Sequence, residues 1–582
     1  MGPDRSEGCP GFFLFGGSFR GSNAGADVDS AERHDVRHDG DVHVGLPVLK
    51  ARHAIASALA SGGLLWLAFP PTGWWPLAFA GVALLSIASA GRGRRGAFGI
   101  GLLAGLAFFL PLIDWLQNVG LHAWLVLAVT QAIATGLLGV ALAHTSRLSW
   151  WPVAHAGLWV GYEALRGRYP LGGFTWGRLA FSQTRGPLVR LAAIGGAPLV
   201  SFATGLVGLL LLWVALTVRG DGVRRWRALA PAVAVLALVA VGSLGVPLPI
   251  AGARTLTVAA VQGNVPALGL DSGAEDLVVV SNHAAATTDL ARKVTAGKVR
   301  APDLVVWPES STDIDPRSDA QVRALVADAA GAIRAPILVG GVLDTDGGRF
   351  LNAGLIWDPV AGPGQIYAKQ HLVPFGEYVP WRGLLGNRIS MLNKYIPRNY
   401  TRGTRPGVFD VAGARVGDVI CFEVAYDGLV RDTVKAGAQL LVVQTNNATY
   451  MRGRDPAQTE QQLEMARLRA VEHGRAVIVA ATSGVSALIG PDGSTLARSG
   501  VFTQEELVAA LPLRSALSVA DRVGGWPEAL ICALALAAIA LASRPRAHRG
   551  PHVRSSAQER SSALERAQPG GARSAPEPGM VA

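Results

Sequence analysis

The apolar residues of this chain are gathered into long segments, seven of them before residue 248 and one after residue 525. A helix that spans a bilayer needs about 20 mostly apolar residues, and most of these segments approach that length. Seven such segments with little polar sequence between them cannot be packed inside one water-soluble domain. We therefore expect a polytopic helical membrane bundle with eight spans, at 53–69, 74–90, 97–115, 122–144, 150–165, 194–217, 228–247 and 526–543.

The composition agrees with a membrane protein. Hydrophobic residues make up 50% of the chain and charged residues only 16%, against about 25% charged in soluble domains. The formal net charge of +11 comes substantially from arginines beside the apolar segments and in the C-terminal tail. Arginines in these positions indicate contact with anionic lipid head groups. Since no nucleic-acid-binding motif is present, we expect no nucleic-acid partner.

Short loops rich in arginine predict which helix ends face the cytoplasm. Such loops follow the second, sixth and eighth segments, and they hold Arg92, Arg94, Arg95, Arg219, Arg224, Arg225, Arg227, Arg544, Arg546 and Arg549. This pattern places the polar block at 248–525 outside the cytoplasm. A fourth basic loop falls on the predicted outer side, where its arginines could hold lipid phosphates; these are Arg166, Arg168, Arg178, Arg185 and Arg190.

The polar block alternates strand-like and helix-like segments, which is typical of an α/β domain. Runs of β-branched residues predict strands at 256–261, 304–307, 337–342, 416–420, 440–444, 477–481 and 486–489. A helix is expected from Pro456 to about His473, with Asp455 as its cap and Gly474 as its stop, and another over 318–333.

These patterns divide the chain into five parts. Residues 1–48 and 546–582 lack the apolar residues needed for a core, so we expect a disordered N-terminal extension and a disordered basic tail. Residues 49–248 hold the first seven membrane helices, 249–522 form the α/β domain, and 523–545 hold the eighth helix.

Cys421 is the only cysteine of the polar block, and it follows the apolar run Val416–Ile420. A lone thiol at the end of a strand is a candidate nucleophile. The alternative is a small buried apolar residue. Cys9 lies in the N-terminal extension and Cys532 in the last apolar segment. Neither is a plausible disulfide partner, so an unused thiol facing an oxidising compartment would be a liability.

Two further segments of the block carry residues that suit a cysteine nucleophile. Glu309 follows a short predicted strand that Pro308 ends, and Lys369 begins a loop rich in Pro, Gly and aromatic residues. A carboxylate can take the thiol proton, and an ammonium can stabilise both a thiolate and the oxyanion of a tetrahedral intermediate. The set predicts acyl transfer, a chemistry that requires no metal or cofactor.

Several of these segments together resemble the apolipoprotein N-acyltransferases, the membrane branch of the nitrilase (carbon-nitrogen hydrolase) superfamily. The resemblance covers roughly residues 50–545, and it rests on Val261-Gln262-Gly263-Asn264-Val265, Trp307-Pro308-Glu309, Lys369 with His371–Pro380, and Ile420-Cys421-Phe422-Glu423. It implies an extracytoplasmic αββα sandwich in which Glu309 is the general base, Lys369 the oxyanion stabiliser and Cys421 the nucleophile. It also implies supporting or substrate-positioning roles for Glu377, Glu423, Gln262, Asn264 and Phe422.

The resemblance further implies the substrates. A phospholipid would donate an acyl chain to Cys421, and the α-amine of the diacylglyceryl-cysteine at a lipoprotein's N-terminus would accept it. We expect a monomer in the bacterial cytoplasmic (inner) membrane. Two alternatives stay open: a membrane-anchored thiol amidase or hydrolase that uses water as acceptor, and a non-catalytic membrane scaffold. The Gly172–Trp176 stretch could line a lipid entry or anchor the chain at the bilayer surface.

Overall fold

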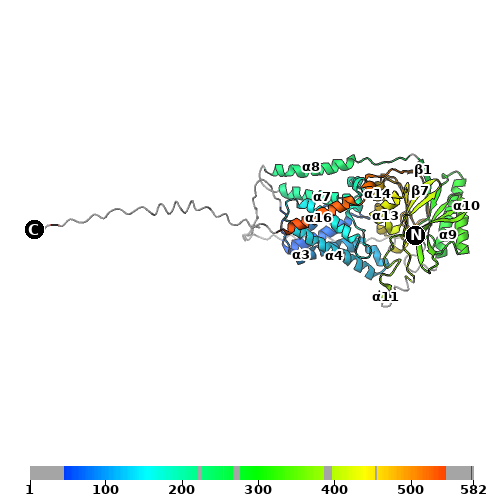
Figure 1. Ribbon diagram of the computed structural model, residues 1–582, viewed down its shortest axis with the longest axis horizontal. Helices are drawn as coiled ribbons and strands as arrows, with labels where there is room; N and C mark the ends of the chain where they lie inside the picture. The colour runs from blue at the N-terminus through cyan, green and yellow to red at the C-terminus, as the bar shows by residue number, and fades with distance from the viewer. Residues whose placement is uncertain are drawn as a thin grey trace, which may run out of the picture. The chain divides into compact units, whose positions relative to one another are not determined.

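The computed structural model describes residues 45–218, 224–252, 254–265, 276–385, 396, 398–451, 455–544 and 579. The expected disordered ends therefore lie almost wholly outside the described residues, as does Cys9. Along the described chain, a bundle of helices precedes an α/β domain, and one more helix follows it (Figure 1).

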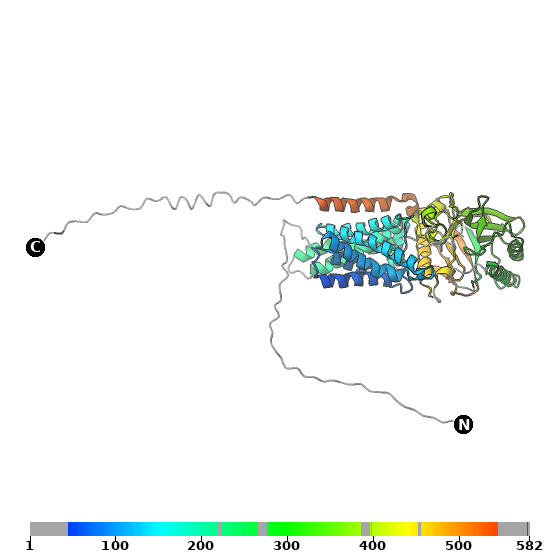
Figure 2. The same cartoon turned by 90° about the horizontal axis from the view of Figure 1, so that it is seen from below.

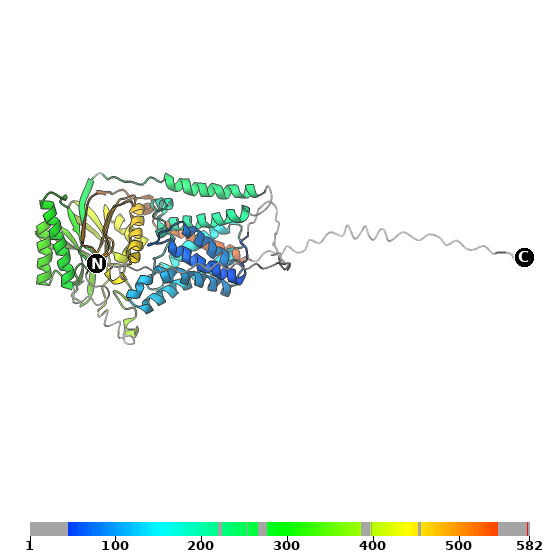
Figure 3. The ribbon, with the colours of Figure 1, turned by 180° about the vertical axis from the view of Figure 1, so that it is seen from behind.

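A helix forms at each of the eight apolar segments, and these helices run side by side over much of their length (Figure 2). They are α1 (Ala51–Leu67), α2 (Leu77–Ser89), α3 (Arg94–Leu112), α4 (Leu121–Thr145), α5 (Trp151–Arg166), α7 (Ala192–Val218), α8 (Arg224–Gly245) and α16 (Trp526–Ser543). The short α6 (Leu179–Ser182) lies in the loop that leads to α7. In Figures 1 and 3, α8 flanks α7 at the margin of the bundle.

Four described segments are long and apolar enough to cross a membrane: Arg94–Leu112, Leu121–Thr145, Pro187–Val218 and Trp526–Ser543. The helices α1, α2 and α5 have 17, 13 and 16 residues, fewer than the roughly 20 that a bilayer requires. The apolar part of α8 is confined to Leu229–Gly245. These helices fit a membrane protein, whereas the count of eight spans stays a prediction.

The α/β domain contains two six-stranded sheets. The first sheet has the order β12-β1-β2-β3-β4-β5 and the second β11-β10-β9-β8-β7-β6. The three strands β1, β2 and β3 are parallel, as are β7, β8 and β9, while the outer strands pair antiparallel. The strands are β1 (Arg254–Gln262), β2 (Leu304–Val306), β3 (Ile337–Asp344), β4 (Phe350–Asp358), β5 (Gly362–Ala368), β6 (Val408–Val411), β7 (Ala414–Ile420), β8 (Leu440–Thr445), β9 (Val477–Ala481), β10 (Ala487–Ile489), β11 (Thr495–Arg498) and β12 (Glu505–Leu513).

The two sheets pack face to face over one buried apolar cluster, which includes Val258, Val306 and Ile420. A second cluster joins the first sheet to α9 (Asp276–Thr295) and α10 (Ala320–Ile333). The other sheet is covered by α13 (Asp427–Lys435) and α14 (Ala457–His473), and the cluster beneath them continues into the helical bundle. The small helices α11 (Arg382–Leu385) and α15 (Val519–Val523) complete the described α-helices. The domain is therefore an αββα sandwich whose α13/α14 layer lies against the bundle.

Every strand expected from the sequence forms, and both expected helices form within a few residues of their predicted bounds. Gly474 ends α14 in the left-handed conformation, with φ of 57°. The cap differs slightly from expectation, because Pro456 stands at the N-cap and the Asp455 carboxylate accepts the Ala457 N–H. Strands β4, β5, β6, β11 and β12 and helices α9 and α13 were not predicted.

Candidate active site

Three strand ends bring Glu309, Lys369 and Cys421 together. Glu309 lies just beyond β2 and Lys369 just beyond β5, both in the first sheet, whereas Cys421 directly follows β7 of the second sheet. All three side chains are buried, with 6%, 2% and 7% of the residue surface exposed. The carboxyl ends of strands are where open α/β sheets bind ligands, and the sandwich places a carboxylate, an ammonium and a thiol there.

The Lys369 ammonium is held between two carboxylates. Its Nζ lies 2.9 Å from Glu309 Oε1 and 3.0 Å from Glu377 Oε1. The side-chain amide of Asn352, on β4, donates to the same two oxygens at 2.7 and 2.6 Å. The Asn446 N–H donates to the other oxygen of Glu309 at 2.9 Å. Glu309 is therefore fixed by three donors, and Lys369 cannot turn away without leaving buried charges unpaired.

The thiol of Cys421 is oriented by groups from two sides. The charges of the Glu309 carboxylate and the Lys369 ammonium both act on the pKa of the thiol. The Thr445 hydroxyl lies 3.4 Å from Sγ, and the Gln462 side-chain amide donates to Sγ at 3.8 Å. Cys421 itself has φ of 55°, a conformation that is uncommon for residues other than glycine. This backbone strain turns the chain sharply between β7 and the following helical turn.

The charges of the site favour an ionised base beside a protonated thiol. Burial, together with the negative charge of Glu309, raises the pKa of Cys421 to about 12. Burial also opposes ionisation of Glu309, but Lys369 and the hydrogen bonds from Asn352 and Asn446 outweigh it and lower the pKa of that carboxyl. Burial likewise opposes the charge on Lys369, but Glu309 and Glu377 raise its pKa well above the usual range. Near neutral pH the site therefore holds a thiol, a carboxylate and an ammonium.

Glu423 connects the lysine loop to the nucleophile. Its fully buried carboxylate accepts the N–H groups of Gln370 and His371 at 2.7 and 2.9 Å. It also accepts the N–H of Ile420 at 2.8 Å and the Tyr367 hydroxyl at 2.9 Å. Glu377 has a similar place in its own loop, where its second oxygen accepts the Val373 N–H. Both acids hold the loop around Lys369 in a fixed shape.

Phe422, next to the nucleophile, packs against aromatic residues of the bundle. Its ring centroid lies 5.7 Å from that of Phe174 and 5.9 Å from that of Trp176. Trp176 is 2% exposed, and its indole N–H donates to Gln461 of α14. The alternative of a bilayer-surface anchor is therefore wrong for Trp176, which lies inside the protein beside the site.

Gln262 and Asn264 lie apart from these contacts. Gln262, fully buried, binds the backbone of Gly500 and Thr503 through its amide nitrogen. Asn264 donates to Phe502 O, and its own backbone N–H donates to Thr482 O. Their described contacts hold the loop after β11 to the end of β1, and a substrate-positioning role for either residue stays a prediction.

Four residues at the site were not predicted: Asn352, Thr445, Asn446 and Gln462. Asn446 and Thr445 stand at the end of β8, directly beside β7, so the strand-end rule that selected Glu309 could have found them. Asn352 and Gln462 lie inside a strand and a helix. No local sequence signal distinguishes either from a solvated polar residue.

The arginines expected to hold lipid phosphates contact protein groups, and a role in phosphate binding stays a prediction. Arg166 is buried and donates to two backbone carbonyls, and Arg178 pairs with Asp427 at 2.7 Å. Arg168 pairs with Glu528, Arg185 pairs with Glu464, and Arg190 donates to the last carbonyls of α8. Their partners are protein groups, because this loop fastens the bundle to the α/β domain and to α16.

The fold and the site define a carbon-nitrogen hydrolase domain attached to a bundle of apolar helices. Residues 257–521 match the carbon-nitrogen hydrolase model, and residues 61–210 match the model of the apolipoprotein N-acyltransferase N-terminal domain. The chain belongs to the apolipoprotein N-acyltransferase family.

Individual relatives agree with this assignment. The chain is 40% identical to the apolipoprotein N-acyltransferase of Mycolicibacterium smegmatis, over 84% of this chain and 85% of that one. It is 30% identical to the apolipoprotein N-acyltransferase of Pseudomonas syringae pv. tomato, over 84% of this chain and 96% of that one. Among solved structures, an amidase from a Nesterenkonia species aligns with 18% identity and a TM-score of 0.35, over 47% of this chain and 99% of the amidase.

Proposed function

We propose that this protein transfers an acyl chain from a phospholipid, through a thioester on Cys421, to the α-amine of the diacylglyceryl-cysteine at the N-terminus of a lipoprotein. The observation that carries the proposal is the buried ion pair of Glu309 and Lys369, whose charges act on the buried Cys421 thiol, at a place where the bundle supplies aromatic side chains. The names of the relatives support the same reaction.

In the first half of the reaction, Glu309 takes the thiol proton as Sγ attacks the carbonyl carbon of the phospholipid ester. Lys369 stabilises the oxyanion of the tetrahedral intermediate. The bond from carbon to the ester oxygen then breaks, and the lysophospholipid leaves as an alcohol with the proton that Glu309 held. Because the pKa of Cys421 is about 12, proton removal accompanies sulfur attack rather than preceding it.

In the second half, the neutral amine of the acceptor attacks the thioester, and Glu309 accepts a proton from the nitrogen. The carbon–sulfur bond breaks, the amide leaves, and the sulfur recovers a proton. Cys421 is only 7% exposed, which restricts access of water to the thioester. Restricted water favours the amine over hydrolysis as the route of discharge.

We also propose an arrangement of the chain in the membrane, which the apolar helices and the basic loops support. Eight spans with the α/β domain on the extracytoplasmic side of the bacterial cytoplasmic membrane would bring both lipid substrates to the thiol. Domain limits of 49–248, 249–522 and 523–545 fit this arrangement, and a monomer suffices because the three reactive groups come from one chain.

The test uses purified protein, a phospholipid labelled in its acyl chain, and a synthetic diacylated lipopeptide with a free α-amine. Intact mass measurement after phospholipid alone should show one acyl group on the protein, absent from Cys421→Ala. Addition of the lipopeptide should remove that group and yield labelled lipopeptide. Release of free fatty acid alone would instead favour the thiol hydrolase, and an unlabelled protein with full activity would exclude the thioester.

A further inference from the structure

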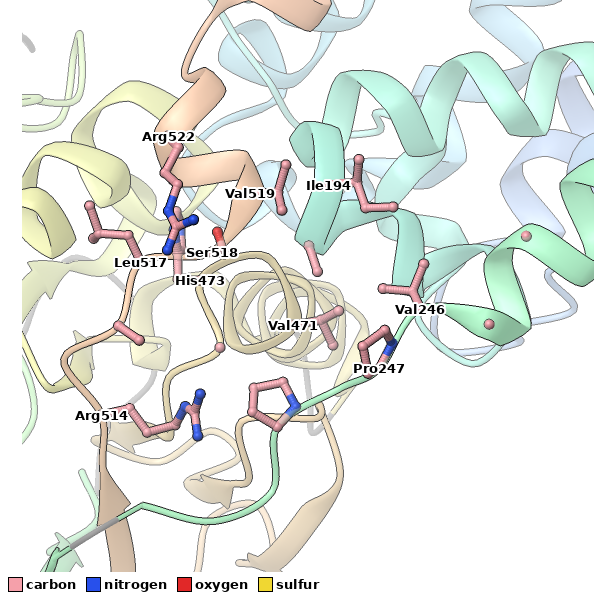
Figure 4. Close-up of a pocket in the computed structure, with 16 residues that line it drawn as sticks. Ile194, Val246, Pro247, Val471, His473, Arg514, Leu517, Ser518, Val519 and Arg522 are labelled. Atoms are coloured by element: carbon pink, nitrogen blue, oxygen red, sulfur yellow. The ribbon is translucent and has the colours of Figure 1, made fainter.

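A cavity of about 600 Å³ lies between the bundle and the α/β domain, apart from the residues of the active site. Its walls come from the start of α7, the end of α8, the end of α14 and the segment that joins β12 to α15 (Figure 4). Neither Glu309, Lys369 nor Cys421 lines it. The volume falls within the range of roughly 300–1,000 Å³ that is usual for small-molecule sites.

The bundle side of the cavity is apolar and incompletely covered. Ile194, Val246 and Pro247 line it, and Ile194 is 38% exposed. The cavity therefore lies at the ends of two apolar helices that are next to the polar domain. In a membrane protein this level corresponds to the boundary between acyl chains and head groups.

The domain side of the cavity is basic. Arg514 and Arg522 both extend toward the cavity from opposite ends of the β12–α15 segment (Figure 4). No Asp or Glu is among the 16 described residues that line it.

A buried donor in this wall lacks a hydrogen-bond partner among the described residues. The Nε of Arg514 is buried and has no hydrogen-bond partner, although its Nη1 donates to Ala251 O. His473 is fully buried, its Nδ1 hydrogen-bonds to Asp521 at 2.7 Å, and its Nε2 lies 3.8 Å from Glu472 Oε2. A buried donor without a partner is rare in proteins, and the Nε of Arg514 therefore indicates a group that the described residues do not supply.

We propose that this cavity binds an anionic phospholipid, with the phosphate held by Arg514 and Arg522 and the acyl chains lying along α7 and α8. A free phosphate ion would leave the apolar walls exposed to water, and a neutral lipid would leave the guanidinium groups without a counter-charge. A phospholipid supplies a phosphate for the basic wall and acyl chains for the apolar wall. This site is separate from the thiol, so the inference does not depend on the proposed acyl transfer.

The test measures retention of phosphatidylglycerol by the full-length chain with native mass spectrometry, in a Cys421→Ala background that prevents turnover. The double substitution Arg514→Gln and Arg522→Gln should weaken binding of one lipid by roughly tenfold or more. The Arg→Lys pair should retain most of the binding. A matched control, Arg300→Gln with Arg323→Gln, removes two exposed charges elsewhere and should leave retention within about twofold.

A second variant tests the apolar half without altering charge. A Cβ added at Gly242 or Gly245 of α8 meets nothing within 4 Å, so leucine at both positions should fill the cavity without a clash. This variant should also lose the bound lipid, while both variants keep the melting temperature of the parent. The proposal is overturned if either variant retains phosphatidylglycerol as the parent does. Displacement of the lipid by glycerol phosphate at equal concentration would also overturn it, because the site would then bind a small anion.

Discussion

The protein contains two clusters of buried charges that have different roles, and they come nearest along the chain at Cys421 and Asp427. The thiol cluster consists of Glu309, Lys369, Glu377 and Cys421. The bridging cluster consists of Glu163 on α5, Arg178 in the loop before α7, Asp427 at the start of α13, and Arg469 and Glu472 on α14. Cys421 belongs to the first cluster and Asp427 to the second, so the segment between them connects the two.

The clusters differ in what their charges face. In the bridging cluster, each arginine pairs with two carboxylates, and Asp427 accepts from Arg178 and Arg469 at 2.7 Å each. In the thiol cluster, two carboxylates share one ammonium, and the remaining neighbour is a neutral thiol. The first arrangement holds the bundle to the α/β domain, whereas the second leaves a carboxylate able to accept a proton. Buried charges therefore hold the bundle and the α/β domain together in the bridging cluster, whereas in the thiol cluster they take part in the reaction.

Removal of the base in the thiol cluster should have the largest effect. Glu309→Gln keeps the shape of the side chain and can still contact Asn352 and Lys369, but it cannot take the thiol proton. We expect acyl transfer to fall by roughly 10²–10⁴-fold, with little change in melting temperature. The measurement is the rate of thioester formation from labelled phospholipid. Transfer at the parent rate would remove Glu309 from the chemistry.

Removal of the ammonium should change the pH dependence as well as the rate. In the parent, Lys369 holds the pKa of Glu309 below its ordinary value of 4.5, so the acid limb of the rate should lie below that pH. In Lys369→Met, burial and the neighbouring Glu377 carboxylate act without a counter-charge, and both raise the pKa of Glu309. The acid limb should therefore move to higher pH.

The rate of this variant at neutral pH should also fall by roughly 10²-fold through loss of oxyanion stabilisation. The pH–rate profile of thioester formation, measured from pH 4 to pH 9, provides both results. Lys369→Arg serves as the control, since it retains a charge and should keep the acid limb close to that of the parent. An unmoved limb in Lys369→Met would mean that the lysine does not tune the base.

The bridging cluster should respond in the opposite way. Arg178→Met leaves Glu163 and Asp427 with one fewer cation in a buried setting, which should destabilise the protein by about 3 kcal/mol. The kcat of the protein that stays folded should change only a few-fold. Thermal unfolding in detergent and kcat per folded molecule check the two parts. A large loss of kcat with unchanged stability would instead place Arg178 in the chemistry, and Arg178→Lys should recover part of the stability.

The sequence was sufficient for the apolar helices and for the parallel strands of both sheets. Long apolar segments predict their helices, and β-branched runs such as β7 and β8 predict their strands, because burial on both faces requires an uninterrupted apolar pattern. The strand β5 was missed because Gly362–Ala368 contains glycines and a proline, which only an edge strand tolerates. The strand β4 contains the buried polar residue Asn352, and the apolar pattern of a buried strand does not predict a polar residue at that position.

The residues of the site that could be predicted are those that lie at strand ends or in distinctive loops. Glu309, Lys369 and Cys421 each follow a strand, and the loop motifs beside them are distinctive. Gln462 is different, because α14 lies between a sheet and the bundle and buries polar residues such as Gln458, Gln461 and Glu464. On most helices those residues would form the solvated face. Only the packing of α14 on both sides shows that Gln462 reaches the thiol.

Substitution of Asp418, on β7, should have the smallest effect of the changes considered. Unlike the others, it should stabilise the protein. It is fully buried, and neither of its carboxyl oxygens has a well-aligned hydrogen-bond donor. Burial, followed by the charges of Glu423 and Glu309, raises the pKa of Asp418 well above 3.8. A Cβ built on Gly354 would lie 2.2 Å from Asp418 Oδ2 and 3.0 Å from Gln444 Oε1, so the two oxygens approach the same point. A protonated Asp418 can donate there.

Because the pKa of Asp418 is raised in the folded protein, its neutral form contributes stability in full below pH 3.8. That contribution is lost as the pH rises toward the folded-state pKa. Asp418→Asn supplies an N–H donor of the same shape at every pH. The variant should therefore melt higher than the parent at pH 8, with the difference shrinking toward pH 4, and its acyl transfer should be unchanged. A lower melting temperature at pH 8 would show that Asp418 is ionised and bound to a cation, and Asp418 would then belong with the reactive charges rather than between the two clusters.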